Sequence, residues 1–392
     1  MVQVQLGQCQ AKTTSSTNTY RKVSHTTSCD LTPLILHSQT INALYTNTLK
    51  IHQMKFTVYI LLNKLFKKYM FRTLLTISLT IMLLSCIRSE TKVNQKSNNL
   101  FSDIKQLQIK PKLCDYKDGI DCRNLRLGDE YHSIKEMGRG YLYSCDGKNP
   151  SAPGSIQERI TWINFPKKTW NILKKLWLPE GDFRPTIGIY SERLDGSRRI
   201  IEINNLPKDG HIGDWPMSDY KILNYIDRNP GIPSSKNLKF VIPSKPNILV
   251  VPKCLSLGPV GVTTNGVVIY NASDARGNDA VAHEIVDVFG GHPARDEYHY
   301  HFIPERFDKN SLEDGHSGKV GYIIDGFPIY GYKGSGGKLI TNKDLDICHG
   351  HAHGELGYHY HATLDYPYTV GCFRGDPFEQ LDGLKGRRLD RP

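Results

Sequence analysis

The chain has 392 residues, of which 39% are hydrophobic and 23% charged, as in soluble globular proteins with a sizeable core. Its net charge of +11 lies at the front: residues 1–85 carry nine Lys and Arg against one acid, which leaves 50 − 9 = 41 basic and 39 − 1 = 38 acidic residues beyond. The residues after position 85 have a net charge of only +3, without the excess of basic residues by which a protein binds phosphate backbones. The composition therefore argues against nucleic-acid binding.

Residues 70–85 have the layout of a signal peptide, because basic residues precede an apolar run from Leu74 to Leu84. That run is too short to span a bilayer comfortably. The segment Leu83-Leu84-Ser85-Cys86 resembles the lipobox of bacterial lipoproteins, although Leu84 is less usual there than a small residue. We therefore expect Cys86 to be lipidated; an uncleaved signal anchor is the alternative.

The segments on either side of the signal peptide have no apolar period. Residues 1–69 are polar and Thr-rich, which indicates an over-extended gene start or disorder. Residues 86–113 are polar and are predicted to form a flexible tether. The expected location is the cell envelope, with the protein exported and bound to the membrane, on its periplasmic or surface face, through the lipid.

Six cysteines remain once the front segment is set aside. An even number in an exported protein predicts disulfides. The closest spacings favour Cys114 with Cys122, and Cys348 with Cys372. The alternatives are that some cysteines are free or that Cys348 binds a metal. The six are Cys114, Cys122, Cys145, Cys254, Cys348 and Cys372.

Residues 114–254 contain short β-branched and aromatic runs, such as RPTIGIYS and NILVVPK, separated by Pro, Gly and Asn. This pattern predicts a β-rich N-terminal part of the domain. The segment TWNILKKLWLPE, which starts at Thr169, is predicted to be one short amphipathic helix with its tryptophans in the core.

Residues 255–376 contain an internal repeat. VGVTTNGVVIYN from Val260 realigns with VGYIIDGFPIYG from Val320, and two further blocks follow in the same order, each ending on Tyr-His-Tyr-His. The units span about 260–301 and 320–361, and residues 377–392 are predicted to be a C-terminal tail.

Each unit opens on a dipeptide typical of β-hairpins, Asn265-Gly266 or Asp325-Gly326, for which both central residues are expected at positive φ. Two hairpin-led units packed face to face would share one core about a pseudo-two-fold axis. The sequence therefore predicts an all-β or β-rich fold, a sandwich or barrel with one or two short helices.

Ten of the 15 histidines lie between His283 and His361. Alternate side chains of a strand share a face, so the two histidines of each Tyr-His-Tyr-His segment should point together and away from the tyrosines. A further histidine follows a glycine in each unit and supplies a third donor. The candidate metal ligands are His292, His299 and His301 in the first unit and His351, His359 and His361 in the second.

Two arrangements are open: one three-His site in each unit, or one four-His site shared at the pseudo-two-fold axis. His349, Asp287 and Asp346 are further candidates, the aspartates as ligands or as acceptors for ligand N–H groups. Imidazole suits several transition metals, and the absence of nearby methionines favours copper(II) or zinc over Cu(I). The alternative without metal is a packing ladder with solvated His tips.

GHPARDEYHYHFIP, GYIIDGFPIYG and CHGHAHGELGYHYHATLDYPYTVGCFRG resemble the signature blocks of the YHYH protein family, and NNLPKDGHIGDWP, which contains His211, resembles an upstream block. The resemblance covers roughly Ile200 to Gly375. It implies kinship of fold, export, often as a lipoprotein, and a metal role, but no reaction. Phe289 departs from the family pattern, because relatives tend to have a cysteine there that matches Cys348.

The main functional hypothesis is a cell-envelope protein that binds metal for acquisition, buffering or delivery. The alternative is a secreted metalloenzyme, a hydrolase or oxidoreductase, with a three-His site and an acid or base among Glu284, Asp287 and Glu297. A further alternative is a structural or adhesive surface domain without metal. No GxSxG or HExxH pattern points to a particular reaction.

Overall fold

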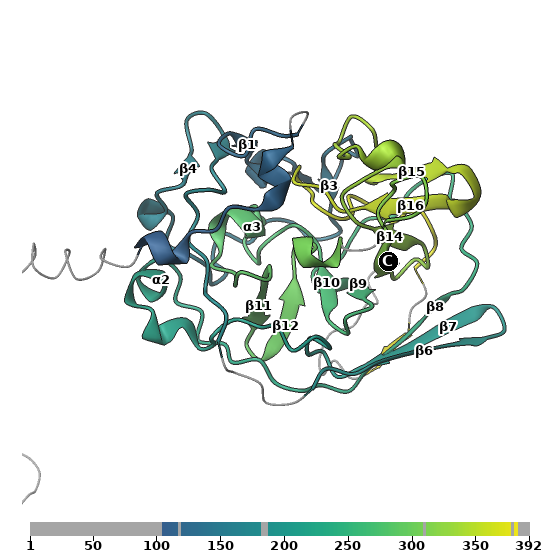
Figure 1. Ribbon diagram of the computed structural model, residues 1–392, viewed down its shortest axis with the longest axis horizontal. Helices are drawn as coiled ribbons and strands as arrows, with labels where there is room; N and C mark the ends of the chain where they lie inside the picture. Colours follow the sequence, from purple (N-terminus) through teal and green to yellow (C-terminus); the bar gives the residue numbers. More distant parts are fainter. Residues whose placement is uncertain (1–103, 117–118, 182–186, 309–310, 378–379, 383–392) are drawn as a thin grey trace, which may run out of the picture. The chain divides into compact units, whose positions relative to one another are not determined.

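The computed structural model describes residues 104–116, 119–181, 187–308, 311–377 and 380–382 (Figure 1). The chain divides into two units, Met1–Ile87 and Arg88–Pro392, and all described residues belong to the second. The expected gene-start extension, the signal peptide and the lipidation site Cys86 lie outside the described residues. In the described part, no helix is long and apolar enough to cross a membrane.

The described residues are rich in strands, as expected, and contain two short α-helices, α2 (Lys221–Ile226) and α3 (Ala280–His283). A three-stranded sheet has the order β1-β5-β4, a four-stranded sheet the order β17-β8-β7-β6, and β2 pairs with β3. These strands are β1 (Leu125–Arg126), β2 (His132–Ser133), β3 (Leu142–Tyr143), β4 (Ile163–Asn164), β5 (Thr169–Trp170), β6 (Tyr190–Asp195), β7 (Arg198–Ile203), β8 (Leu238–Pro243) and β17 (Gln380–Asp382).

Both repeat units lie in one eight-stranded sheet with the order β11-β12-β10-β9-β13-β14-β16-β15. Each unit consists of two hairpins joined by a connecting segment. The second strand of the second hairpin pairs parallel with the second strand of the first hairpin. The first unit supplies β9 (Pro259–Thr263), β10 (Val268–Tyr270), β11 (Gly291–Ala294) and β12 (Glu297–Tyr300). The second supplies β13 (Lys319–Ile323), β14 (Pro328–Tyr330), β15 (Gly350–His353) and β16 (Gly357–His361).

The two units are related by a pseudo-two-fold axis, as the repeat predicted. The strand order reads the same from either edge, and β9 pairs antiparallel with β13 in the middle. Val262 lies opposite Tyr322, which is its own repeat equivalent, so the axis passes between these two residues. The units therefore join edge to edge in one sheet rather than face to face, and this sheet is open at β11 and β15 instead of closing into a barrel.

The predicted hairpins are present, but their turns differ from the expected type. Gly266 and Gly326 have φ of +84° and +92°, whereas Asn265 and Asp325 are not among the described residues with positive φ. The Gly266 N–H donates to Thr263, whose own N–H bonds the carbonyl of the residue after the glycine. This is a type I turn followed by a left-handed glycine, a three-residue hairpin loop that needs positive φ only once.

Three expectations about local structure were wrong. No helix forms at Thr169, because this residue and Trp170 pair with neighbouring strands and the next turn is closed by the Asn171 side chain. Residues 104–113, expected in the flexible tether, include the buried side chains of Leu107 and Leu113. The expected tail contributes β17, which pairs with β8.

Three disulfides are present in the described residues. Cys114 pairs with Cys122 and Cys348 with Cys372, as expected, and Cys145 pairs with Cys254. Cys348 is therefore not a free thiolate for a metal. The apolar core runs continuously under the sheets, and its largest fully buried side chains include Trp170, Trp177, Trp215, Tyr298, Tyr332 and Tyr360.

Candidate metal centres

The strand register brings histidines of each unit together. His292 on β11 lies directly opposite His299 on β12, and His351 on β15 lies opposite His359 on β16. The alternation along the strand places the tyrosines on the other face, where the two of each segment contact each other with ring centroids 5.6 Å apart. The predicted division of the Tyr-His-Tyr-His segments into a histidine face and a tyrosine face is confirmed.

Centre A comprises His292, His299, His301 and Glu284. The Nε2 atom of His301 lies 3.0 Å from that of His299 and 3.1 Å from that of His292. The Glu284 Oε2 lies 3.3 Å from the His292 Nε2 and 3.8 Å from the His301 Nε2. All three rings are buried. The three ring nitrogens therefore converge in the interior, close enough to share one metal ion, and the Glu284 carboxylate lies beside two of them.

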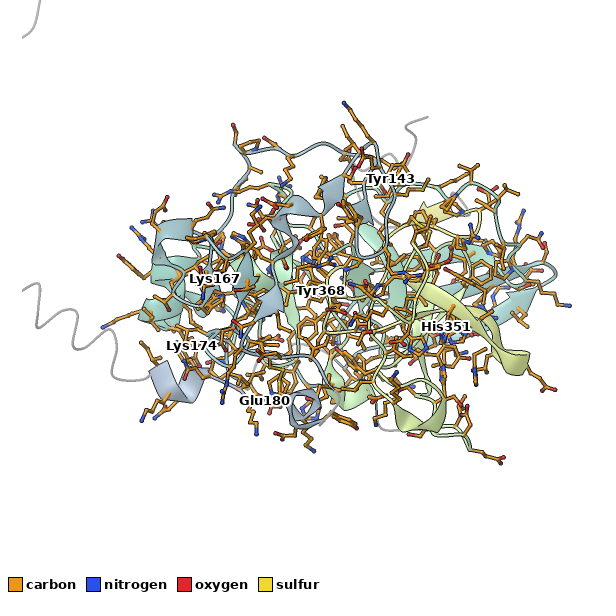
Figure 2. All side chains as sticks on the ribbon, turned by 90° about the horizontal axis from the view of Figure 1, so that it is seen from above. Tyr143, Lys167, Lys174, Glu180, His351 and Tyr368 are labelled. Atoms are coloured by element: carbon orange, nitrogen blue, oxygen red, sulfur yellow. A yellow bond between two sulfur atoms is a disulfide. The ribbon has the colours of Figure 1, made fainter. Side chains whose placement is uncertain are left out.

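Centre B comprises His316, His351, His359 and His361. The Nε2 atoms of His359 and His361 each lie 3.1–3.2 Å from those of both His316 and His351. His351, on β15 (Figure 2), is partly exposed, and the other three rings are buried. This is a four-nitrogen site within one unit and its preceding segment, not a site shared at the pseudo-two-fold axis.

In each histidine, the acceptor that Nδ1, the ring nitrogen facing away from the centre, contacts determines which nitrogen carries the proton. A carbonyl oxygen only accepts, so a histidine whose Nδ1 contacts one must be protonated there, and the Nε2 of the neutral ring is then a bare lone pair. Five rings meet this condition: His299 on Glu297 (3.1 Å), His301 on Asn271 (2.6 Å), His316 on Ser317 (2.8 Å), His359 on Gly357 (2.9 Å) and His361 on Gly331 (2.7 Å).

Lone pairs aimed at one another across about 3 Å repel unless a cation lies between them. A backbone acceptor on the outer nitrogen is also the usual partner of a metal-bound histidine, because it orients the ring and raises its basicity. His351 has such a partner in the backbone of Asp344. Both centres are therefore groups of side chains that could hold a transition-metal ion.

Burial sets the protonation of these groups. It lowers the pKa of His301 to about 4 and that of His359 to about 3, and it holds the pKa values of His292 and His361 well below the usual range. Burial also raises the pKa of Glu284 well above its usual range. The imidazoles are thus neutral at neutral pH, the form that binds metal ions.

Asp287 does not join centre A. It is fully buried, and its carboxylate accepts the N–H groups of Phe289 (2.9 Å), Gly291 (3.1 Å) and Gly213 (2.9 Å) and the hydroxyl of Tyr298 (2.6 Å). It therefore closes the turn before β11 and ties it to the tyrosine face of β12.

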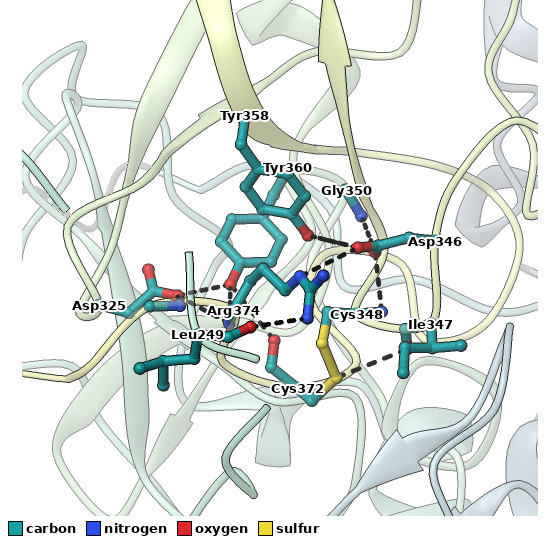
Figure 3. Close-up of a disulfide and its surroundings, with 11 residues drawn as sticks. Leu249, Asp325, Asp346, Ile347, Cys348, Gly350, Tyr358, Tyr360, Cys372 and Arg374 are labelled. Carbon is teal, nitrogen blue, oxygen red and sulfur yellow. Dashed lines mark hydrogen bonds and ion pairs between the residues drawn. A yellow bond between two sulfur atoms is a disulfide. The ribbon is translucent and has the colours of Figure 1, made fainter. Parts of the chain in front are cut away.

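Asp346 has the same role in the second unit and does not join centre B. Its carboxylate accepts the N–H groups of Cys348 (2.9 Å) and Gly350 (3.1 Å) and the hydroxyl of Tyr358 (Figure 3). The first tyrosine of each Tyr-His-Tyr-His segment thus fixes the turn that carries the opposing histidine.

The model of the family described as YHYH protein matches residues 239–339. The chain contains a YHYH domain. No curated protein and no solved structure matches the chain.

The matched part of the YHYH domain contains all four residues of centre A but only His316 of centre B. The other three histidines of centre B lie beyond its end at residue 339. The repeat, rather than the family match, therefore connects the second centre to the first.

The remaining candidate histidines of the domain lie outside both centres. His349, a proposed ligand, points its Nε2 to the hydroxyl of Thr363 (3.0 Å). His353 pairs with Asp314 (2.9 Å) and stacks on the ring of His316. His211, in the upstream block, pairs with Glu180 (2.8 Å).

Two members of the centres were not predicted as ligands. His316 precedes the second unit and has no histidine at the matching position of the first, which is Ser256. Glu284 was considered only as an acid or base. The sequence offered one indication of both residues, which is their position along the chain. His316 and Glu284 each lie within a few residues of a strand or helix that the repeat places beside the Tyr-His-Tyr-His segment.

Proposed function

We propose that this YHYH-domain protein binds two transition-metal ions at the cell envelope, one in centre A and one in centre B, for metal acquisition, buffering or delivery. The observation that carries the proposal is the convergence of the Nε2 atoms, with the Nδ1 atoms of five of the seven rings bonded to backbone carbonyls. The location, and the membrane as partner through a lipid on Cys86, rest on the signal-peptide pattern of the sequence.

Copper(II) and zinc fit the donors best. On an ion bound at about 2.0–2.1 Å, neighbouring nitrogens are roughly 3.3–3.4 Å apart in a tetrahedron and roughly 2.8–3.0 Å apart in a square plane. The four Nε2 separations of 3.1–3.2 Å in centre B lie between these values. The described cysteines are in disulfides, so neither centre has a thiolate that would select a softer ion.

Metal analysis of the purified full-length chain tests the proposal. We expect two equivalents of zinc or copper, and one equivalent in either the His299→Ala/His301→Ala or the His359→Ala/His361→Ala variant. His211→Asn is the matched control, because this histidine pairs with Glu180 away from both centres. Chelation should lower the melting temperature, since an ion at 1,000 times its Kd stabilises the folded state by about 4 kcal/mol.

The proposal fails if the wild-type chain holds no stoichiometric metal after incubation with either ion and chelation leaves the melting temperature unchanged. That result would favour a structural or adhesive domain in which the histidines only pack. A single equivalent that is lost from one double variant and kept in the other would restrict the proposal to one centre.

A metalloenzyme is the second candidate function, and Glu284 is the observation that favours it. Catalytic sites commonly combine three protein ligands with a position open to water or substrate, whereas closed four-ligand sites are structural. Centre A has three histidines and a carboxylate, and centre B has four histidines. Any reaction would therefore take place at centre A.

A further inference from the structure

The fourth donor distinguishes the two centres. In centre B it is the imidazole of His316, whose Nε2 lies 3.1–3.2 Å from the neighbouring ring nitrogens. In centre A it is the carboxylate of Glu284, at 3.3 and 3.8 Å from the two ring nitrogens it approaches. The carboxylate is thus the donor that lies farthest from its companions.

His316 is fixed on both sides of its ring. Its Nδ1–H donates to the carbonyl of Ser317 (2.8 Å), and the ring stacks on His353 at a centroid distance of 5.2 Å and an angle of 15°. The side chain is also fully buried. Turning it away from centre B would break a hydrogen bond inside the protein, so this fourth donor stays in place, although His351 of the same centre is partly exposed.

Glu284 is fixed through its backbone rather than its carboxylate. Its N–H donates to the carbonyl of Ala280, the first residue of α3, and its own carbonyl accepts from the buried Lys175 ammonium (2.6 Å). Within the described residues no hydrogen bond holds its carboxylate, which lies beside the ring nitrogens of His292 and His301. The carboxylate can therefore rotate about the side-chain bonds while the backbone stays in place.

Solvent approaches centre A on the side of this carboxylate. The Glu284 side chain is 14% exposed, whereas those of His292 and His301 are 5% and 3% exposed. Water and small anions therefore have more access to the Glu284 side chain than to the imidazoles of centre A, which are buried.

We propose that the ion of centre A, unlike that of centre B, accepts a small anion from solution at the position of the Glu284 carboxylate. The inference rests on the proposed function, because it requires an ion in each centre. Three neutral imidazoles leave the charge of a divalent ion uncompensated when the carboxylate turns away, so the entering ligand is expected to be anionic and small, such as hydroxide or azide. The exchange moves one anionic donor out and one in, with no redox change.

The test uses the full-length chain loaded with cobalt(II), whose visible absorption reports its ligands, and azide as the probe. We expect two cobalt equivalents and an azide-dependent change in the bands of one of them. Glu284→His should abolish that change by supplying a fourth imidazole, and Glu355→His, on an exposed turn, is the matched control that should keep it. His316→Glu should add a second azide-responsive ion.

The metal content of every variant is measured in the same samples. A wild type that holds no stoichiometric cobalt would contradict the proposed function itself, whereas a single equivalent held by centre B alone would restrict that function to one centre and overturn the inference. Two equivalents with no azide response, or with a response at both ions, would overturn only the inference. So would a response that survives in Glu284→His. If that variant does not fold, Glu284→Gln replaces it, and unchanged azide affinity there would overturn the inference as well.

Discussion

The two repeat units share a backbone plan but stabilise it by different means. Beside the second centre, Cys348 and Cys372 form a disulfide that joins the turn before β15 to the segment after β16 (Figure 3). The first unit has Phe289 at the position of Cys348, and its ring contacts His211 and the guanidinium of Arg306. The two units therefore share the paired histidines of their strands but differ in the contacts that stabilise the turns around them.

The change of repeat register shows where the donors diverged. Ala280 corresponds to Ile340 at an offset of 60, and Asp287 to Asp346 at an offset of 59, by equivalent backbone hydrogen bonds. The additional residue of the first unit thus falls in the stretch that forms α3 and presents Glu284. In the second unit this stretch is a turn, where the Asp344 carboxylate bonds Thr341 instead of reaching centre B.

The largest expected contrast concerns the disulfide. Cys348→Ser/Cys372→Ser should lower the free energy of unfolding by about 3 kcal/mol, because the bridge closes a loop of 24 residues in the unfolded chain. Phe289→Ala should cost about 1 kcal/mol, the value of a partly exposed cation–π contact and its packing. Urea unfolding of both variants measures the contrast. Equal losses would mean that the two units are supported to the same extent.

The two turn aspartates provide the next contrast. Asp287→Ala should cost about 2–3 kcal/mol, because it leaves buried N–H donors without an acceptor. Asp346→Ala should cost about 1 kcal/mol, since its side chain is 33% exposed and water can replace it. Chemical denaturation measures both, with metal content as the second readout. A larger loss for Asp346→Ala would contradict the role assigned to burial here.

The last contrast concerns pH. Burial raises the pKa of Asp325 to about 6, above the value of about 3.9 in an unfolded chain. The folded state thus binds this proton more tightly, and the stabilisation, about 3 kcal/mol, is complete below about pH 4 and lost as the pH rises to about 6.

Asp325→Asn should remove this part of the pH dependence of unfolding. The matching residue of the first unit is already an amide, Asn265, so Asn265→Asp is the mirrored control and should add no such dependence at its partly exposed turn. Unfolding free energies at several values between pH 4 and 6 make the comparison. An unchanged slope in Asp325→Asn would assign the dependence to other groups.

The fold and most donors could be predicted because both depend on features that the two units share. The hairpins, the pseudo-two-fold axis and the cross-strand histidines follow from the repeat and from the alternation of side chains along a strand. Glu284 and His316 could not be found in this way, because each belongs to one unit only. The edge-to-edge pairing of β9 with β13 was equally hidden, since a repeat does not specify which strands meet between its copies.

The antiparallel pairing about Val262 and Tyr322 is the contact that two separate copies of one unit would make in a symmetric homodimer. In such a dimer any substitution would alter both halves at once, so both centres would always be identical. Joining the halves in one chain removes that constraint and makes their association independent of protein concentration. The covalent link is therefore what allows one molecule to hold two unlike centres in a fixed ratio of one to one.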